Sequence, residues 1–171
     1  DATALKAYNF KGLTKIGIYP IGEKFKKYYT DEIILIPDFF PSEIFNRDFQ
    51  NKKAKIITSI AMFYDLEDPK SFVLSIKETL EKDGIWHFEQ SYMPTMLKMN
   101  SYDTICHEHL EYYSLKTIKE LLDNCGMKII DVSFNDINGG SFAVTSSRCD
   151  SPLVSNTRLI NQLLKDEDDL E

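Results

Sequence analysis

The chain is poor in the features that mark secreted, membrane-spanning and nucleic-acid-binding proteins. Its three cysteines, at Cys106, Cys125 and Cys149, are odd in number and lack close pairing, which is typical of reduced thiols in a cytoplasmic protein. No apolar run reaches membrane-spanning length, and the first residues lack the pattern of a signal peptide. The 20 basic residues are outnumbered by 27 acidic ones and form no long basic stripe. We therefore expect a cytoplasmic protein that binds neither nucleic acid nor membrane.

What is present suits one α/β domain. Of the 171 residues, 43% are hydrophobic and 12% aromatic, which is enough to fill a core. Short apolar runs predict strands at residues 14–19, 32–36, 54–60 and 84–89, with helical patterns between them, notably at residues 70–82. Ser42 is the expected cap of a helix at residues 41–48, and Trp86 and Phe88 are expected in the core. A helix at residues 115–124, capped by Ser114, precedes two further strands at 127–134 and 141–146. Because no helix separates the last two strands, we expect a mainly parallel sheet with an antiparallel end.

Residues 90–114 break this alternation and hold two of the three histidines, with Glu108 between His107 and His109. Imidazole, carboxylate and phenol groups at this density can transfer protons near neutral pH. The alternative is an ordinary polar loop. In an extended segment the two histidines would share one face, and for His107 a core position tied to a backbone carbonyl is the competing interpretation. A metal site would need a third ligand besides His-x-His, and His87 lies in mid-strand, so we expect no metal.

Three segments together resemble one family, the S-adenosylmethionine-dependent sugar C-methyltransferases that act on nucleotide-linked keto-deoxysugars. They are Ser59-Ile-Ala-Met-Phe-Tyr-Asp-Leu-Glu-Asp-Pro69, Tyr102-Asp-Thr-Ile-Cys-His-Glu-His-Leu-Glu-Tyr-Tyr-Ser114 and Asn138-Gly-Gly-Ser141. The resemblance implies a Rossmann-like class I methyltransferase sheet, S-adenosylmethionine as cofactor and a nucleotide-sugar substrate. It also implies that residues 1–148 are a partial core that lacks the first strand and the glycine-rich loop. Residues 149–171 would then be a linker and the opening helix of a further domain, an acidic helix with little to pack against.

The resemblance also implies the roles of particular residues. His109 aligns with the family's catalytic base, Glu108 would orient the substrate or the imidazole, and Tyr102 would hydrogen-bond a sugar hydroxyl or the developing oxyanion. Tyr19 stands where the family usually has the acid that holds the ribose hydroxyls, and a phenol lacks the two acceptors of a carboxylate. The remaining expected contacts are His107, Tyr112 and Asn138 for the substrate, and Asp1, Asp38, Phe39, Ser59, Met62 and Phe63 for the cofactor.

Two other functions stay open. One is methylation of oxygen or nitrogen on a small metabolite, and the other is a non-catalytic relative that keeps the fold, which the departure at Tyr19 favours. If the first strand is absent, residues 14–19 and 54–60 each lose a neighbouring strand. We therefore expect the 171 residues alone neither to bind S-adenosylmethionine nor to form a robust monomer.

Overall fold

The computed structural model describes residues 2–49 and 52–170, and for Asn138 it describes the backbone but not the side chain. The chain divides into two compact units, Asp1–Lys52 and Lys53–Glu171. The first unit is built on two parallel strands, in which Lys15 lies opposite Ile33 and Ile18 opposite Ile36. Its elements are α1 (Thr3–Ala7), β1 (Lys15–Ile18), the 3-10 helix η1 (Gly22–Tyr28), β2 (Ile33–Ile36) and α2 (Glu43–Asp48).

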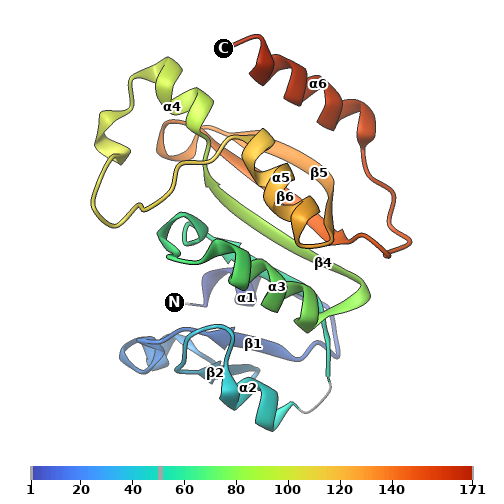
Figure 1. Ribbon diagram of the computed structural model, residues 1–171. Helices are drawn as coiled ribbons and strands as arrows, with labels where there is room; N and C mark the ends of the chain where they lie inside the picture. The colour runs from blue at the N-terminus through green and yellow to red at the C-terminus, as the bar shows by residue number, and fades with distance from the viewer. Residues whose placement is uncertain (1, 50–51, 171) are drawn as a thin grey trace. The chain divides into compact units, whose positions relative to one another are not determined.

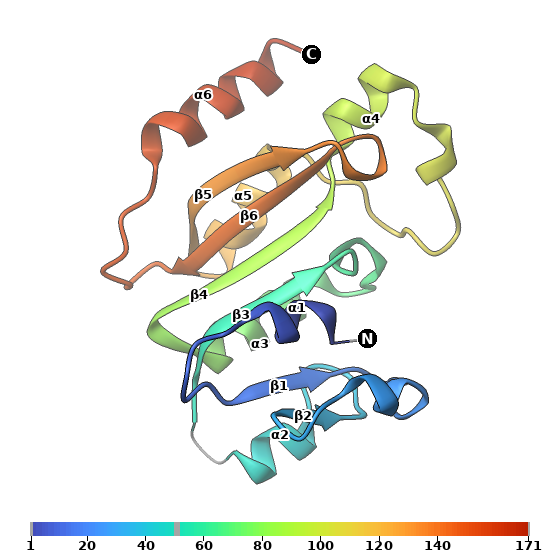
Figure 2. The same ribbon diagram turned by 180° about the vertical axis from the view of Figure 1, so that it is seen from behind.

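The second unit contains a four-stranded sheet in the order β3-β4-β6-β5 (Figures 1 and 2). β3 and β4 are parallel, whereas β6 runs antiparallel to both β4 and β5, so the antiparallel end of the fold is confirmed. Its elements are β3 (Ala54–Ile60), η2 (Phe63–Asp65), α3 (Pro69–Thr79), β4 (Leu80–Ser91), α4 (Met93–Met99), η3 (Tyr102–Thr104), α5 (Leu115–Asn124), β5 (Met127–Asn135), η4 (Ile137–Gly139), β6 (Ser141–Arg148) and α6 (Thr157–Asp168).

An aromatic core lies on the face of this sheet that α3 and α5 cover in the two views. Alternation along β4 sends Trp86 and Phe88 to that face, and both are fully buried. Phe63 enters the same cluster, with its ring centroid 5.4 Å from that of Trp86 and 5.5 Å from that of Phe88. The sheet and η2 are thus held together by ring packing immediately beyond the end of β3.

Side-chain caps fix where the helices begin. Ser42 Oγ accepts a hydrogen bond from the Phe45 amide at 3.1 Å, and Ser114 Oγ accepts one from the Thr117 amide at 3.2 Å. Both serines therefore satisfy amides that have no partner within their own helix. The predicted N-caps of α2 and α5 are confirmed.

Several expectations need correction. β4 begins at Leu80 rather than near residue 84, and residues 90–114 contain the helix α4 and the 3-10 turn η3. α6 does not lack a packing surface, because Ile160 and Glu167 are buried and the helix contacts α5 and β5.

The strands form two hydrogen-bonded sheets, and within the described part of the chain β1 pairs with β2 alone and β3 with β4 alone. No helix in the described ranges is long and apolar enough to cross a membrane.

Candidate active site

The half-buried His109 is held by the backbone at the end of a tight turn. Its Nδ1 lies 2.8 Å from the carbonyl oxygen of Thr104. A carbonyl oxygen can only accept a hydrogen bond, so Nδ1 carries a proton, and whenever the ring is neutral Nε2 keeps its lone pair. The His109 amide donates to the Cys106 carbonyl at 3.3 Å, which makes residues 106–109 a turn, so the shared face that an extended segment would give the two histidines does not apply. The neutral ring is thereby in the tautomer that a general base requires.

The η2 turn supplies the surface on which this imidazole rests. The ring centroid of Tyr64 is 4.2 Å from that of His109, and the Tyr64 carbonyl accepts hydrogen bonds from the Leu110 and Glu111 amides at 3.0 and 3.1 Å. Desolvation by burial raises the pKa of the Tyr64 phenol, and neighbouring Asp65 and Cys106 add to the shift. Tyr64 therefore remains a neutral phenol that packs against the imidazole.

Asp65 is a neighbour of His109 that the sequence arguments missed. Partial desolvation raises the pKa of its carboxyl, and the charge of Glu108 adds to this effect while His109 acts in the opposite direction. An acid in this position can stabilise the imidazolium that forms when His109 takes a proton. Asp65 lay within the first motif, but the sequence offered no means of knowing that η2 packs against the histidines.

The third motif also reaches this region. Gly139 and Gly140 have φ angles of +79° and +122°, a conformation that favours glycine. A Cβ on Gly139 would come within 2.9 Å of Ser101 Oγ, and one on Gly140 within 2.4 Å of Thr95 Cγ2. The glycines thus let the β5–β6 turn approach the segment that carries the histidines. All three motifs lie within the second unit, and the third approaches Thr95 and Ser101, in the segment that precedes the second motif.

The other predicted substrate contacts surround His109 less closely. The His107 side chain is 92% exposed, so the core position tied to a carbonyl is wrong for this residue; His109 makes the carbonyl contact instead. Glu108 is also exposed, with Oε1 3.9 Å from His107 Nε2, and the Thr104 carbonyl orients the imidazole. Tyr102 is 73% exposed at the start of η3. The Tyr112 ring lies edge-on, 6.4 Å from that of His109, and Asn138 belongs to η4 with its side chain outside the described set.

The expected cofactor residues of the second unit are largely engaged in packing. Ser59 is buried, and its Oγ accepts a hydrogen bond from Trp86 Nε1 at 3.1 Å. Phe63 is 1% exposed and surrounded by aromatic rings, so it is a core residue and its expected place on a cofactor surface is not observed. Met62 is half-buried just before η2.

The expected cofactor residues of the first unit share one edge of its parallel sheet. Tyr19 follows β1, and its amide donates to the Ile36 carbonyl at the end of β2, at 3.0 Å. The Asp38 carboxylate accepts from the Phe39 amide and from Ser42 Oγ, both at 2.8 Å, so it contacts the N-cap residue of α2 and no amide of the helix itself. The Phe39 ring is 73% exposed. Asp1 lies outside the described residues.

Two polar side chains near these motifs are buried without a partner. Both amide atoms of Gln90 and the hydroxyl of Tyr113 lack a hydrogen bond among the described residues. Burial raises the pKa of the Tyr113 phenol, whose ring stacks on Phe63 at 5.4 Å. Buried polar groups are rarely left unpaired, because each costs about 1–3 kcal/mol. Tyr113 belongs to the second motif, whereas Gln90, near the end of β4, lies outside all three motifs and no sequence pattern singled it out.

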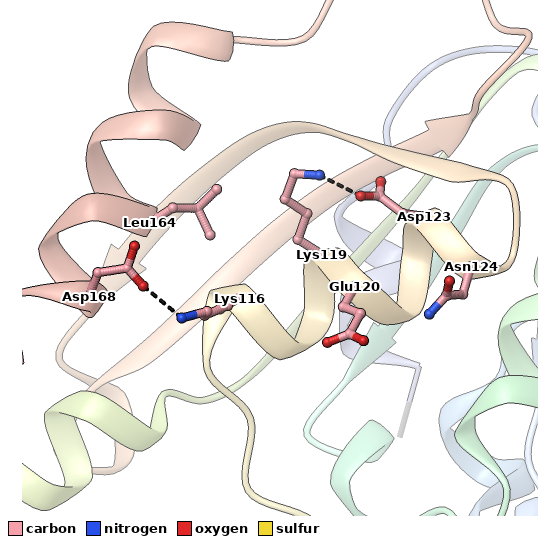
Figure 3. Close-up of a pocket in the computed structure, with 7 residues that line it drawn as sticks. All are labelled: Lys116, Lys119, Glu120, Asp123, Asn124, Leu164 and Asp168. Carbon is pink, nitrogen blue, oxygen red and sulfur yellow. Dashed lines mark hydrogen bonds and ion pairs between the residues drawn. The ribbon is translucent and has the colours of Figure 1, made fainter. Parts of the chain in front are cut away.

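Two further features of the second unit do not form a ligand site of their own. His87 Nδ1 lies 2.9 Å from Thr145 Oγ1, and no cluster of three or more metal-binding side chains occurs among the residues the structure describes. A groove of about 410 Å³ lies between α5 and α6 (Figure 3). Its lysines pair with its own acids, Lys116 with Asp168 at 2.7 Å and Lys119 with Asp123. With Glu120 the lining holds three acids against two lysines, so this groove offers no surplus positive charge to an anionic ligand.

Comparison with known proteins defines the class. A family model described as a methyltransferase domain matches residues 4–132, and the chain belongs to that family. It is also similar to the C-methyltransferase NovU of Streptomyces niveus, with 32% identity over 91 residues. That match covers 53% of this chain and 22% of the relative.

Solved structures share the fold at low sequence identity. A chain from the complex of the Haloferax volcanii Trm112 methyltransferase activator with a methyltransferase has a TM-score of 0.69 and 14% identity, over 85% of this chain and 76% of that chain. The magnesium protoporphyrin IX methyltransferase of Synechocystis PCC 6803, solved with bound S-adenosylhomocysteine, has a TM-score of 0.55 and 11% identity, over 78% of this chain and 63% of that chain. These likenesses establish a methyltransferase fold.

Proposed function

We propose that this chain belongs to an S-adenosylmethionine-dependent C-methyltransferase that acts on a nucleotide-linked keto-deoxysugar, with His109 as the general base. The observation that carries the proposal is the 2.8 Å contact between His109 Nδ1 and the Thr104 carbonyl, which leaves Nε2 able to accept a proton. The partial match to a C-methyltransferase supports carbon as the atom that is methylated.

The proposed reaction requires the transfer of one proton from the substrate to a residue of this chain. A ketone acidifies the hydrogen on the neighbouring carbon, and Nε2 of His109 takes that proton while the electron pair of the C–H bond moves into an enolate. The imidazolium then carries a positive charge beside Asp65, whose carboxylate acts favourably on it. Tyr102 and Tyr112 are the phenols of the same segment that can donate a hydrogen bond to the enolate oxygen. When bound, S-adenosylmethionine supplies the methyl group that the enolate carbon receives.

The residues proposed to hold the cofactor are consistent with a nucleoside. At the carboxyl edge of β1 and β2, Tyr19 offers a phenol to the ribose, and the exposed Phe39 ring offers an apolar face to the adenine. Asp38 keeps both carboxylate oxygens in contacts of its own, so it contributes by shaping the turn after β2. In the second unit, Ser59 and Met62 are the proposed neighbours of the methionine end.

Solvent exchange separates this proposal from methylation at oxygen or nitrogen. The protein is incubated in D₂O with a nucleotide-linked 4-keto-deoxysugar, with and without S-adenosylmethionine, and the products are analysed by mass spectrometry and NMR. We expect deuterium at the carbon beside the ketone and, with the cofactor, a new carbon-bound methyl group. A methyl group on oxygen or nitrogen, without exchange at carbon, would show that the reaction class is different.

A further inference from the structure

The carboxylate of Glu167, near the end of α6, is buried although it belongs to the most acidic helix of the chain. Its residue is 7% exposed, and it is the one acidic residue classed as buried in the described ranges. Oε1 accepts hydrogen bonds from the Tyr92 hydroxyl and the Leu115 amide, both at 2.6 Å, and Oε2 accepts one from the Lys116 amide at 2.8 Å. A buried carboxylate persists only where its charge is compensated in this way.

Two of these donors are the first amides of α5. Amides in the first turn of a helix have no acceptor within the helix, and the positive end of the helix dipole favours an anion there. Ser114 Oγ accepts a hydrogen bond from the Thr117 amide, and the Glu167 carboxylate accepts hydrogen bonds from the amides of Leu115 and Lys116. The beginning of α5 is therefore capped by its own N-cap residue together with a carboxylate from a distant helix.

The third donor, the Tyr92 hydroxyl, lies at the start of the segment that ends where α5 begins. Tyr92 directly precedes residues 93–114, named here the histidine loop, and Leu115 directly follows them. Both ends of the loop therefore bind to one carboxylate. The Met93 amide also donates to the Tyr113 carbonyl at 3.0 Å, which closes the base of the loop a second time. Hydrogen bonding to Glu167 contributes to raising the pKa of the Tyr92 phenol, after desolvation, so the phenol stays protonated and remains a donor.

From these contacts we infer that Glu167 is a positioning residue, through which α6 fixes the base of the histidine loop and with it the place of His109. The inference rests on the proposed function of His109. It assigns to α6 a role in catalysis without any contact to the substrate. The Tyr64 carbonyl binds the loop separately, at Leu110 and Glu111. Loss of the Glu167 contacts therefore leaves the base held by the Met93–Tyr113 hydrogen bond alone of the two closures, while the Tyr64 contacts remain.

The test compares two neutralising substitutions on neighbouring residues of α6. Glu167→Gln replaces one acceptor oxygen with an N–H donor that faces amide donors. Asp168→Asn removes the same charge one residue later, where the carboxylate pairs with the Lys116 ammonium at the surface (Figure 3). Hydrogen–deuterium exchange of residues 92–117 and steady-state methyl transfer are measured for both variants and for the wild-type protein.

For Glu167→Gln we expect about ten- to a hundred-fold faster amide exchange in this segment, because charged hydrogen bonds to its first helical amides are lost. We expect kcat to fall about ten-fold or more, with the KM for S-adenosylmethionine within about two-fold of the wild-type value, since a misplaced base affects the chemical step. Asp168→Asn should match the wild-type protein in both measurements. Unchanged exchange in a folded Glu167→Gln protein, or equal effects of both variants, would overturn the inference.

Tyr92→Phe provides a second route if Glu167→Gln does not fold. It removes the contact at one end of the loop and leaves both α5 amides bonded to the carboxylate. We expect faster exchange at residues 92–100 with the amides of Leu115 and Lys116 still protected, and unchanged exchange there would reject the inference. If the exchange results hold but the wild-type protein shows no deuterium incorporation into the sugar, the proposed function fails and the anchoring of the loop stands.

Discussion

Replacement of His109 by asparagine separates its chemical role from its structural one. The asparagine amide can still donate a hydrogen bond to the Thr104 carbonyl, but it has no basic nitrogen where Nε2 stands. The ring contact with Tyr64 at 4.2 Å is lost, which costs about 0.5–1.5 kcal/mol of stability. Loss of a general base costs about a hundred- to ten-thousand-fold in rate, or about 2.7–5.5 kcal/mol in the activation barrier. The effect on rate should therefore exceed the effect on stability.

The assay uses the same substitution two residues earlier as its control. His107→Asn changes a side chain that is 92% exposed, so kcat should be retained and any effect should appear in the KM for the sugar. Methyl transfer, deuterium incorporation at the sugar carbon and thermal unfolding are measured for both variants. Retention of more than a tenth of the wild-type rate by His109→Asn would refute the assignment of the base, as would an equal loss of kcat in both variants.

Three further substitutions test the surroundings of the site. Asp65→Asn should raise the melting temperature at neutral pH, because the pKa of this carboxyl is raised in the folded protein and its ionised form is disfavoured there. This gain in melting temperature should vanish as the pH falls below the ordinary pKa of 3.8. The kcat of the variant should fall, because the imidazolium of His109 loses its partner. Ser59→Ala should lower the free energy of unfolding by about 1–3 kcal/mol in urea titration, since Trp86 Nε1 is left without its acceptor. Tyr19→Asp should tighten S-adenosylmethionine binding in calorimetry, because each well-formed charged hydrogen bond to the ribose contributes about 1.5–3 kcal/mol.

For each of these three substitutions, one result would contradict the prediction. A melting temperature of Asp65→Asn that follows the wild-type value at every pH would mean that desolvation of this carboxyl is negligible. If Ser59→Ala weakened cofactor binding without lowering stability, its hydroxyl would serve the ligand rather than the indole. Unchanged or weaker binding by Tyr19→Asp would mean that the pocket is built around a phenol.

Local sequence patterns predicted most of the elements. The alternation of Trp86 and Phe88 along β4 and the caps at Ser42 and Ser114 depend on residues close in the chain, and the structure confirms them. The carbonyl partner of His109 was missed because it depends on the path of the backbone through a turn. A shared face for the two histidines held only for an extended segment, and in the observed turn His109 is half-buried while His107 is exposed.

Long-range contacts explain the other failures. Glu167 contacts the amide of Leu115, 52 positions away in sequence, and its helix was expected to have no packing surface. An acidic helix at the end of a chain gives no sign that one of its carboxylates is buried, because neighbouring positions carry the same residue types. Asp65 likewise gained its significance from packing of η2 against the histidine loop, which no periodicity encodes.

The contact between His109 and the carbonyl of residue 104 has a consequence for how this site tolerates change. The acceptor belongs to the main chain, so substitution of the threonine side chain leaves it in place. An insertion or deletion between residues 104 and 109 would displace the oxygen from the ring even if every side chain were retained. The hydrogen bond that places the proton on Nδ1 of His109 therefore depends on the separation of five residues between the acceptor and the histidine. Substitution of Thr104 should therefore leave activity nearly unchanged, whereas a one-residue insertion or deletion between residues 104 and 109 should abolish it.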